Sequence, residues 1–307
     1  AAARAFIGSL AEEQKQRVVL AEDAPQRKKW SNLPAAYVDR SGLHLGALSK
    51  RQRVLLFEFL AASLSKEGYQ LVAEIIAGEA FLSTEKEAEK HRWSPENYWI
   101  CFYGMPNDAS AWSFHFGGHH LAINMTFREG VLYSMSPCFI GNSPGVFRYA
   151  GKDYQALLRM HESGSALYEA LSEEQKKRAS YEKIPARLVT GAGRDGVVPK
   201  MTGVNVGSLD PAQQERVLSA IREWVAIQPA EGSVPLMRRI NAELADTHFT
   251  WIGEYGVNQA CYFRIQSPSI VIELVSKVAN VGKDADGKGH YHSVFRDLSS
   301  DYGVPKK

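Results

Sequence analysis

The chain has 307 residues, 45% of them hydrophobic, and a formal net charge of +2 at pH 7. This length supports a substantial core, either as one large domain or as two closely joined halves. Charges of both signs are interspersed, which argues against a nucleic-acid surface, and no stretch approaches the ~18 apolar residues that a membrane span needs. Cys101, Cys138 and Cys261 lack Cys-x-x-Cys spacing, so we interpret them as core residues and not as zinc ligands.

Four short motifs with the pattern of helix starts recur along the chain, at residues 10–14, 48–52, 171–175 and 209–213. Ser49 and Ser172 each precede a glutamine by three residues, as in a capping box, and Asp210 precedes a proline. The first motif has Ala11 at the cap position and is weaker. Both pairs of motifs are 38 residues apart (48 − 10 = 209 − 171), and the second pair follows the first by 161 (171 − 10). This spacing predicts an internal duplication.

The apolar periodicity predicts helices followed by strands, twice over. Helices are expected at 49–64, 69–82, 153–160, 163–171, 172–181, 211–227 and 234–245. Strands are expected at 98–103, 112–116, 119–127, 131–136, 249–253, 260–266, 269–275 and 290–295. The glycine-rich loop 190–207 connects the halves. Its Gly191 to Gly196 stretch follows no strand and opens no helix, so it is no phosphate-binding loop.

This order of elements predicts an α+β fold with antiparallel sheets. We expect a single compact unit over residues 1–307, made of two pseudo-repeats at about 1–150 and 151–307. The simplest arrangement packs a sheet from each half around a pseudo-two-fold axis, with the helices outside. Aligned strands set Asn124 opposite Glu273 and Tyr133 opposite His292.

The segment 112–127 places histidines and two glycines in a strand-like stretch. One face of the strand should carry His120, Ala122, Asn124 and Thr126, and the other His119, Leu121, Ile123, Met125 and Phe127. The second face is almost wholly apolar and should meet the core, whereas the first is typical of the wall of a site. The alternative is that the two histidines simply cap a strand end.

Further polar residues stand where strands predict burial. Tyr262, Arg264 and Gln266 share one strand face, and Glu273 interrupts an apolar strand, where a carboxylate is costly unless it meets a cation or a metal. His290 and His292 also share one face. Alternatives remain open: Glu273 pairing with Arg264, and the two histidines bonding to backbone in a solvated hairpin.

Histidines and a carboxylate on adjacent strands are typical of catalytic metal sites. We predict the metal ligands His119, His120, Glu273, His290 and His292. The predicted catalytic residues are Arg264, Arg296 and His115, and the predicted substrate contacts are Asn124, Tyr262, Gln266 and Asp297.

The leading hypothesis is a hydrolase that uses a divalent metal ion to act on a small polar or anionic substrate. Zinc, iron, copper and manganese are not distinguished by such a ligand set. Iron or copper would support an oxidoreductase instead, and a non-enzymatic ligand- or metal-binding protein is the third reading. The oligomeric state is left open.

Several motifs resemble the DUF3500 family. They lie at residues 48–52, 118–126, 262–268, 272–273, 290–297 and 301–303 and span nearly the whole chain. Ser267 and Leu298 stand where such proteins often have glycine and proline. No reaction comes with the resemblance. It implies export to the periplasm or secretion, which agrees with a mature chain that begins without methionine, although a cytoplasmic location stays open.

Overall fold

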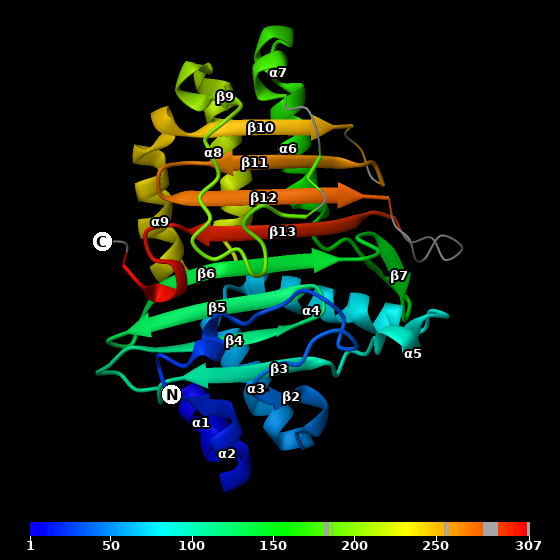
Figure 1. Ribbon diagram of the computed structural model, residues 1–307, viewed down its shortest axis with the longest axis vertical. Helices are drawn as coiled ribbons and strands as arrows, with labels where there is room; N and C mark the ends of the chain where they lie inside the picture. Colours follow the sequence, from blue (N-terminus) through cyan, green and yellow to red (C-terminus); the bar gives the residue numbers. More distant parts are fainter. Residues whose placement is uncertain (181–183, 186, 255, 257, 279–287, 306–307) are drawn as a thin grey trace.

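One large sheet runs through the whole molecule (Figure 1). The computed structural model describes residues 1–307 except 181–183, 186, 255, 257, 279–287 and 306–307. The strand order is β1 (Val19–Leu20), β3 (Tyr98–Tyr103), β4 (Trp112–Gly118), β5 (Leu121–Arg128), β6 (Val131–Asn142), β13 (His290–Asp297), β12 (Ile270–Lys277), β11 (Cys261–Gln266), β10 (His248–Gly253) and β9 (Val204–Asn205). β2 (Leu43–His44) pairs with β3, and β7 (Phe147–Tyr149) pairs with β8 (Lys152–Tyr154) in a separate hairpin.

Nine α-helices occur in the described residues. They are α1 (Ala2–Gly8), α2 (Glu12–Val18), α3 (Lys50–Ser63), α4 (Lys66–Leu82), α5 (Ala88–His91), α6 (Leu158–Glu169), α7 (Glu173–Ala179), α8 (Pro211–Val225) and α9 (Ala230–Ala242). Short 3-10 helices are η1 (Pro25–Lys28), η2 (Leu45–Ala47), η3 (Val206–Ser208), η4 (Leu244–Asp246) and η5 (Asp301–Gly303). No described helix has the length and apolar character to span a membrane.

The predicted α+β class is confirmed, and the sheet is antiparallel except where β1 pairs with β3. The expectation of two packed sheets is wrong, because the strands of both halves form one sheet. β6 from the first half and β13 from the second pair side by side at its centre, with Phe139 opposite Val294. Helix and strand periodicities do not reveal which strand edges will pair, since pairing depends on tertiary contacts.

Three of the four predicted helix starts are confirmed by their caps. The side-chain oxygens of Ser49, Ser172 and Asp210 each accept a hydrogen bond from the backbone N–H three residues later. Ala11 has no side-chain oxygen, and its own N–H instead donates to the Gln14 side chain at 3.0 Å. Local capping chemistry therefore sets these boundaries.

Other predicted boundaries are wrong. α4 begins three residues before the predicted start, because Ser65 caps it by accepting from the Gly68 N–H at 2.9 Å. The two helices predicted over 153–171 are one helix, α6, inside which Ser163 bonds back to the Met160 carbonyl and caps nothing. The predicted end of the following helix, Tyr181, lies outside the described residues.

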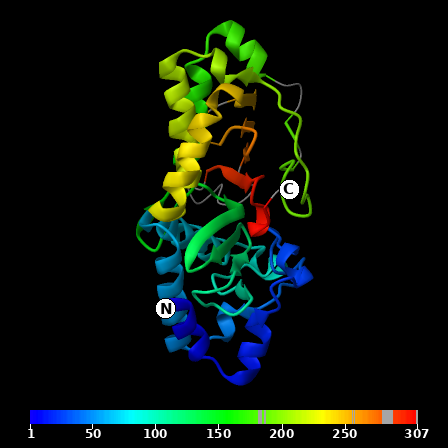
Figure 2. The same cartoon turned by 90° about the vertical axis from the view of Figure 1, so that its left-hand side faces the viewer.

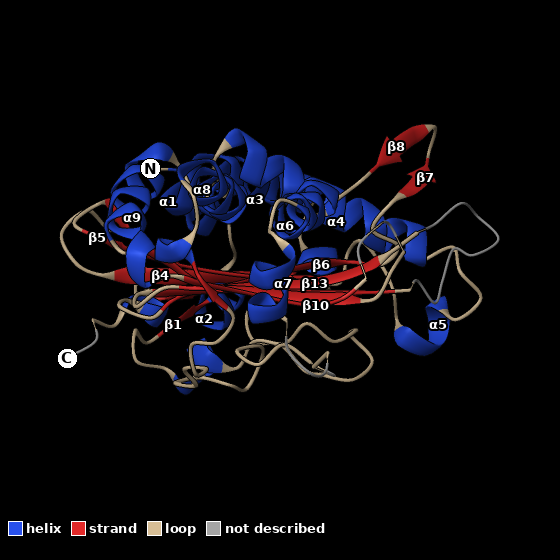
Figure 3. Ribbon diagram, turned by 90° about the horizontal axis from the view of Figure 1, so that it is seen from above, coloured by secondary structure: helices blue, strands red, loops and turns tan. Residues whose placement is uncertain are grey.

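The two faces of the sheet are covered differently. Seen edge-on, α1, α3, α4, α6, α8 and α9 lie on one face (Figure 3). Turning the molecule shows irregular segments along the opposite face (Figure 2). The alternation predicted for β5 is confirmed: Leu121, Ile123 and Met125 belong to the large core, whereas Ala122 belongs to a smaller one with Trp30, Phe139, Leu188, Val294 and Tyr302.

A candidate metal centre beside the central strand pair

His119 and His120 form the turn between β4 and β5. His120 has a positive φ of 62°, which reverses the chain direction. The preceding Gly118 is needed here, because an added Cβ would lie 2.5 Å from the Asn97 carbonyl oxygen. As a result, His119 reaches Glu79 on α4, and His120 turns toward β13.

Gly141 on β6 separates His120 from His292. It lies directly opposite His292 in the β6–β13 ladder, and its N–H donates to the His120 carbonyl at 2.7 Å. An added Cβ at Gly141 would lie 3.0 Å from His292 Cδ2 and 3.1 Å from His120 Cδ2. The absence of a side chain on the middle strand therefore lets the two imidazoles approach each other, with ring centroids 5.1 Å apart.

His290 completes a group of three imidazoles. It lies two residues before His292 on the same face of β13, and the two Nε2 atoms are 3.0 Å apart. The ring centroid of His290 is 4.6 Å from that of His292 and 5.4 Å from that of His120. The planes of the three rings meet at 56–86°, and one nitrogen of each lies within 4.8 Å of the others. We call His120, His290 and His292 the histidine triad.

The triad is uncharged at neutral pH. Burial is the main cause that lowers the pKa of each member, and the charges of neighbouring histidines lower it further. The pKa of His290 falls to about 4, and those of His120 and His292 lie well below the usual value of 6.5. Neutral imidazole keeps the lone pair that a metal ligand needs.

Glu79 and His119 form a buried pair beside the triad. The Glu79 Oε2 atom lies 2.8 Å from His119 Nδ1, and Glu79 is only 2% exposed. Its second oxygen, Oε1, has no hydrogen-bond partner among the described residues. The His119 ring stacks on that of His120, with centroids 3.7 Å apart. A carboxylate thus fixes a histidine whose ring contacts the triad.

Glu79 was missed from the sequence, although a signal exists. It lies four residues after Ile75 and three before Leu82, on the helix stripe that packs on the sheet. A carboxylate on such an apolar stripe is as unusual as one in an apolar strand.

Glu273 does not join the histidines. Its carboxylate is fully buried and accepts hydrogen bonds from the backbone N–H groups of Val189 (2.9 Å) and Thr190 (2.7 Å). The hydroxyls of Thr190 and Tyr262 also donate to it. These four donors satisfy the charge that the sequence assigned to a metal. The alternative, an ion pair with Arg264, is also absent, although the two residues are directly opposite each other.

The predicted arginines likewise fasten segments to the sheet. Arg264 donates to the Lys200 carbonyl and the Thr202 hydroxyl. Arg296 is 1% exposed and forms ion pairs with Asp195 at 2.9 Å and Asp301 at 2.6 Å. Neither guanidinium reaches the triad, so their predicted catalytic roles receive no support from their positions.

The remaining predicted residues are bonded in the same way. His115 Nδ1 lies 3.0 Å from Asn124 Oδ1, and Asn124 donates to the Pro137 carbonyl. Gln266 donates to the Pro199 carbonyl, and Asp297 pairs with Arg239. Each of these four side chains therefore has a partner within the fold, although the Gln266 Oε1 atom has none among the described residues. A strand pattern alone cannot distinguish such internal pairing from ligand binding.

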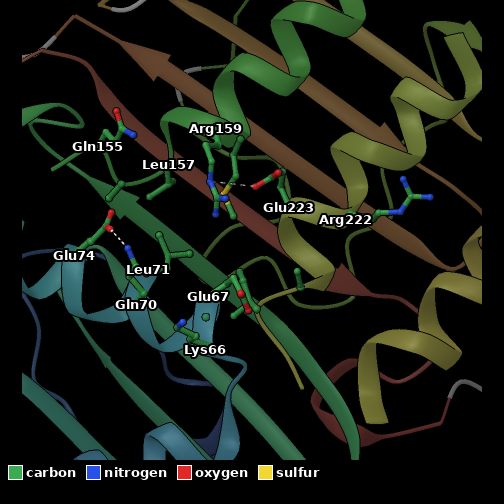
Figure 4. Close-up of a pocket in the computed structure, with 15 residues that line it drawn as sticks. Lys66, Glu67, Gln70, Leu71, Glu74, Gln155, Leu157, Arg159, Arg222 and Glu223 are labelled. Atoms are coloured by element: carbon green, nitrogen blue, oxygen red, sulfur yellow. Dashed lines mark hydrogen bonds and ion pairs between the residues drawn. The ribbon is translucent and has the colours of Figure 1, made fainter. Parts of the chain in front are cut away.

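A groove of about 530 Å³ lies on the helix face, away from the triad (Figure 4). It is lined by the first turns of α4 and α6 and the last turn of α8. Its rim charges are largely exposed: Arg159, 70% exposed, lies 3.7 Å from Glu223. The groove contains none of the histidines.

The fold and the site define an α+β protein with one central sheet and a partly buried histidine cluster where its two halves meet. The sequence model of the family described as "Protein of unknown function (DUF3500)" matches residues 1–304. The chain belongs to this family, as the sequence motifs predicted. No curated protein and no solved structure matches it.

Proposed function

We propose that the histidine triad binds a divalent transition-metal ion and that the protein is a metal-dependent hydrolase. The observation that carries this proposal is the convergence of His120, His290 and His292 from both halves of the chain. Three uncharged imidazoles form the protein ligand set of one class of catalytic zinc site, in which a fourth position remains open for water or substrate.

The ring separations support a tetrahedral ion. An imidazole bound at about 2.0–2.1 Å places its ring centroid about 3.2 Å from the ion, so two at the tetrahedral angle have centroids about 5.2 Å apart. The three separations in the triad are 4.6, 5.1 and 5.4 Å.

His119 is not a ligand of the same ion in this proposal. Glu79, His119 and His120 also bring ligand atoms within 4.8 Å of one another. However, the His119 and His120 centroids are only 3.7 Å apart and the rings are nearly parallel. That spacing is too short for two ligands at a tetrahedral angle, so Glu79 and His119 act beside the ion.

The chemistry follows from this arrangement. A divalent ion held by the triad, with water at its open position, would lower the pKa of that water to about 7 and polarise a substrate carbonyl. Glu79 fixes the orientation of His119, which then supports His120 by stacking and supplies a polar group near the reacting water. The same triad on copper or iron would support oxidation, so the identity of the metal separates the two reaction classes.

We also propose that the chain arose by internal duplication. The amides of Gln14 and Gln52 bond to each other, as do those of Gln175 and Gln213, and both pairs are 38 residues apart. Each half places four long strands in the sheet, β3 to β6 in the first half and β10 to β13 in the second, which end at the paired strands β6 and β13. The short strands β1, β2 and β9 have no such one-to-one match. A pseudo-two-fold between these strands would account for this arrangement.

Elemental analysis of tag-free protein tests the metal centre. We expect about one ion per chain, lost in the double variant His120→Ala, His292→Ala. His161→Gln is the matched control, because His161 is equally buried but lies outside the triad. Zinc together with ester or amide hydrolysis supports the proposal. Wild-type protein that stays metal-free after reconstitution overturns it, and redox-active iron or copper replaces hydrolysis with oxidation.

A further inference from the structure

Arg40 is a partly buried cation for which the fold provides too few acceptors. Its Nη2 atom donates to the carbonyls of Ser31 and Leu33. Its Nε and Nη1 atoms are covered but have no hydrogen-bond partner, and among the described residues no carboxylate lies within ion-pair distance. A buried charge with unpaired donors costs free energy unless a ligand supplies the acceptor.

The other arginines on this face of the sheet differ. Arg27 donates to two hydroxyls and two carbonyls, and Arg296 has two carboxylates. Arg128 leaves only one nitrogen, Nε, without a partner. Burial lowers the pKa of Arg40 to about 10, although the charges of Tyr98 and Glu79 act in the opposite direction. Arg40 therefore remains a cation near neutral pH.

Arg40 lies beside the proposed metal centre. The segment that holds its Nη2 atom, residues 31–33, also touches the triad, because the His120 N–H lies 3.4 Å from the Asn32 carbonyl. The guanidinium lies over the Trp99 ring, 5.3 Å from its centroid, and Trp99 is opposite Gly117 on the strand that leads to the histidine turn. The charge of Glu79 also acts on Arg40.

We propose that Arg40 binds an oxyanion, a carboxylate or phosphate group of the substrate, next to the metal. Arginine is well suited to this role because its N–H groups form charge-assisted hydrogen bonds with such oxygens. Arg40 is itself partly exposed, and residues 33–39 contain no helix or strand. In this proposal the segment shifts locally so that an anion reaches Nε and Nη1. This proposal adds a substrate class, anionic molecules, to the proposed hydrolase, and it rests on that proposed function for the reaction.

Anion titration tests the proposal without a known substrate. Inorganic phosphate and acetate are titrated separately into wild-type protein by calorimetry, both zinc-loaded and after chelation. We expect at least one of them to bind in both forms, and which one binds identifies the anionic group. Arg40→Gln should weaken binding about ten-fold or more, because charged hydrogen bonds are lost.

Arg128→Gln is the matched control. Arg128 also lies over an aromatic ring, that of Tyr133, and bonds to a carbonyl, but at the other end of β5. We expect its anion affinity to stay within two-fold of wild type. Arg40→Lys keeps the positive charge and serves if the glutamine variant does not fold, as judged by thermal melting; it should still weaken binding.

Two results overturn the assignment: neither anion binds wild type, or Arg40 variants bind as tightly as wild type. Binding that depends on zinc and persists in Arg40→Gln assigns the anion to the metal and also overturns it. Metal content is measured on the same samples. Failure of the metal centre would therefore appear as missing zinc, independently of anion binding to the chelated protein.

Discussion

Gly141→Ala is a minimal perturbation that separates a metal centre from a structural histidine cluster. The added methyl would lie 2.8 Å from the Tyr291 carbonyl oxygen, besides its contacts of 3.0 and 3.1 Å with His292 and His120. The carbonyl belongs to a paired strand and cannot rotate away, so the neighbours must shift by a few tenths of an ångström. Overpacking of this kind costs about 1–3 kcal/mol of unfolding free energy.

The same methyl pushes apart two of the three proposed ligands. Catalytic sites need their groups held within about 0.5 Å of the productive geometry. We therefore expect zinc affinity to fall about ten-fold or more, measured by competition with a chromophoric chelator. Urea unfolding of the metal-free protein gives the stability change separately.

Gly8→Ala is the control, because a Cβ there meets nothing within 4 Å and Gly8 lies in helix α1. Alanine should be neutral or stabilise by up to about 1 kcal/mol, and leave zinc affinity unchanged. If Gly141→Ala folds and binds zinc within two-fold of the wild-type affinity, the ion does not lie between His120 and His292.

Three further outcomes are expected. Glu79→Gln should keep the zinc stoichiometry but lower hydrolytic activity or zinc affinity about 10–100-fold. Steady-state rates and competition with a chelator measure the two effects. If both stay unchanged, Glu79 has no role in the site. Glu273→Gln should lower the unfolding free energy by about 1–3 kcal/mol, measured by urea unfolding, because Glu273 accepts hydrogen bonds from Val189, Thr190 and Tyr262. Its zinc content should equal that of wild type. Loss of zinc would instead indicate that Glu273 is a metal ligand. Burial lowers the pKa of His161 to about 4, so the unfolded chain binds the proton first as pH falls below about 6.5. The unfolding free energy of the metal-free protein should therefore decrease from pH 6.5 toward pH 4. Urea unfolding at several pH values should show a smaller decrease in His161→Gln than in wild type. An identical decrease in the two proteins would show that His161 is not its cause.

The sequence predicted features that depend on local chemistry. Ser49, Ser172 and Asp210 cap helices because a side-chain oxygen and a backbone N–H lie three residues apart in the chain itself. The alternation in β5 likewise separates Leu121 and Ile123 from Ala122 by geometry alone. Strand periodicity also predicts polar residues at the strand ends that hold His119–His120 and His290–His292. In the structure the two pairs lie next to each other.

Features that depend on distant partners could not be predicted. Glu273 is satisfied by backbone N–H groups 83 and 84 residues away, in a segment that has no strand or helix pattern. From the sequence, this is indistinguishable from a carboxylate that binds a metal, since burial is the only signal. Glu79 joins His119 across 40 residues because α4 packs against β6, a contact that neither element encodes alone.

The proposed duplication explains why the centre lies at the joint of the halves. The His119–His120 turn ends the β4–β5 hairpin, and its counterpart in the second half, the turn between β11 and β12, holds Ser267 and Ser269. There the hydroxyls of both serines donate to Glu243. Strand pairing of β6 with β13 brings the first turn to His290 and His292, so each half supplies only part of the triad. A repeat alone would therefore lack the triad, and the proposed metal centre would require the paired strands of the complete sheet.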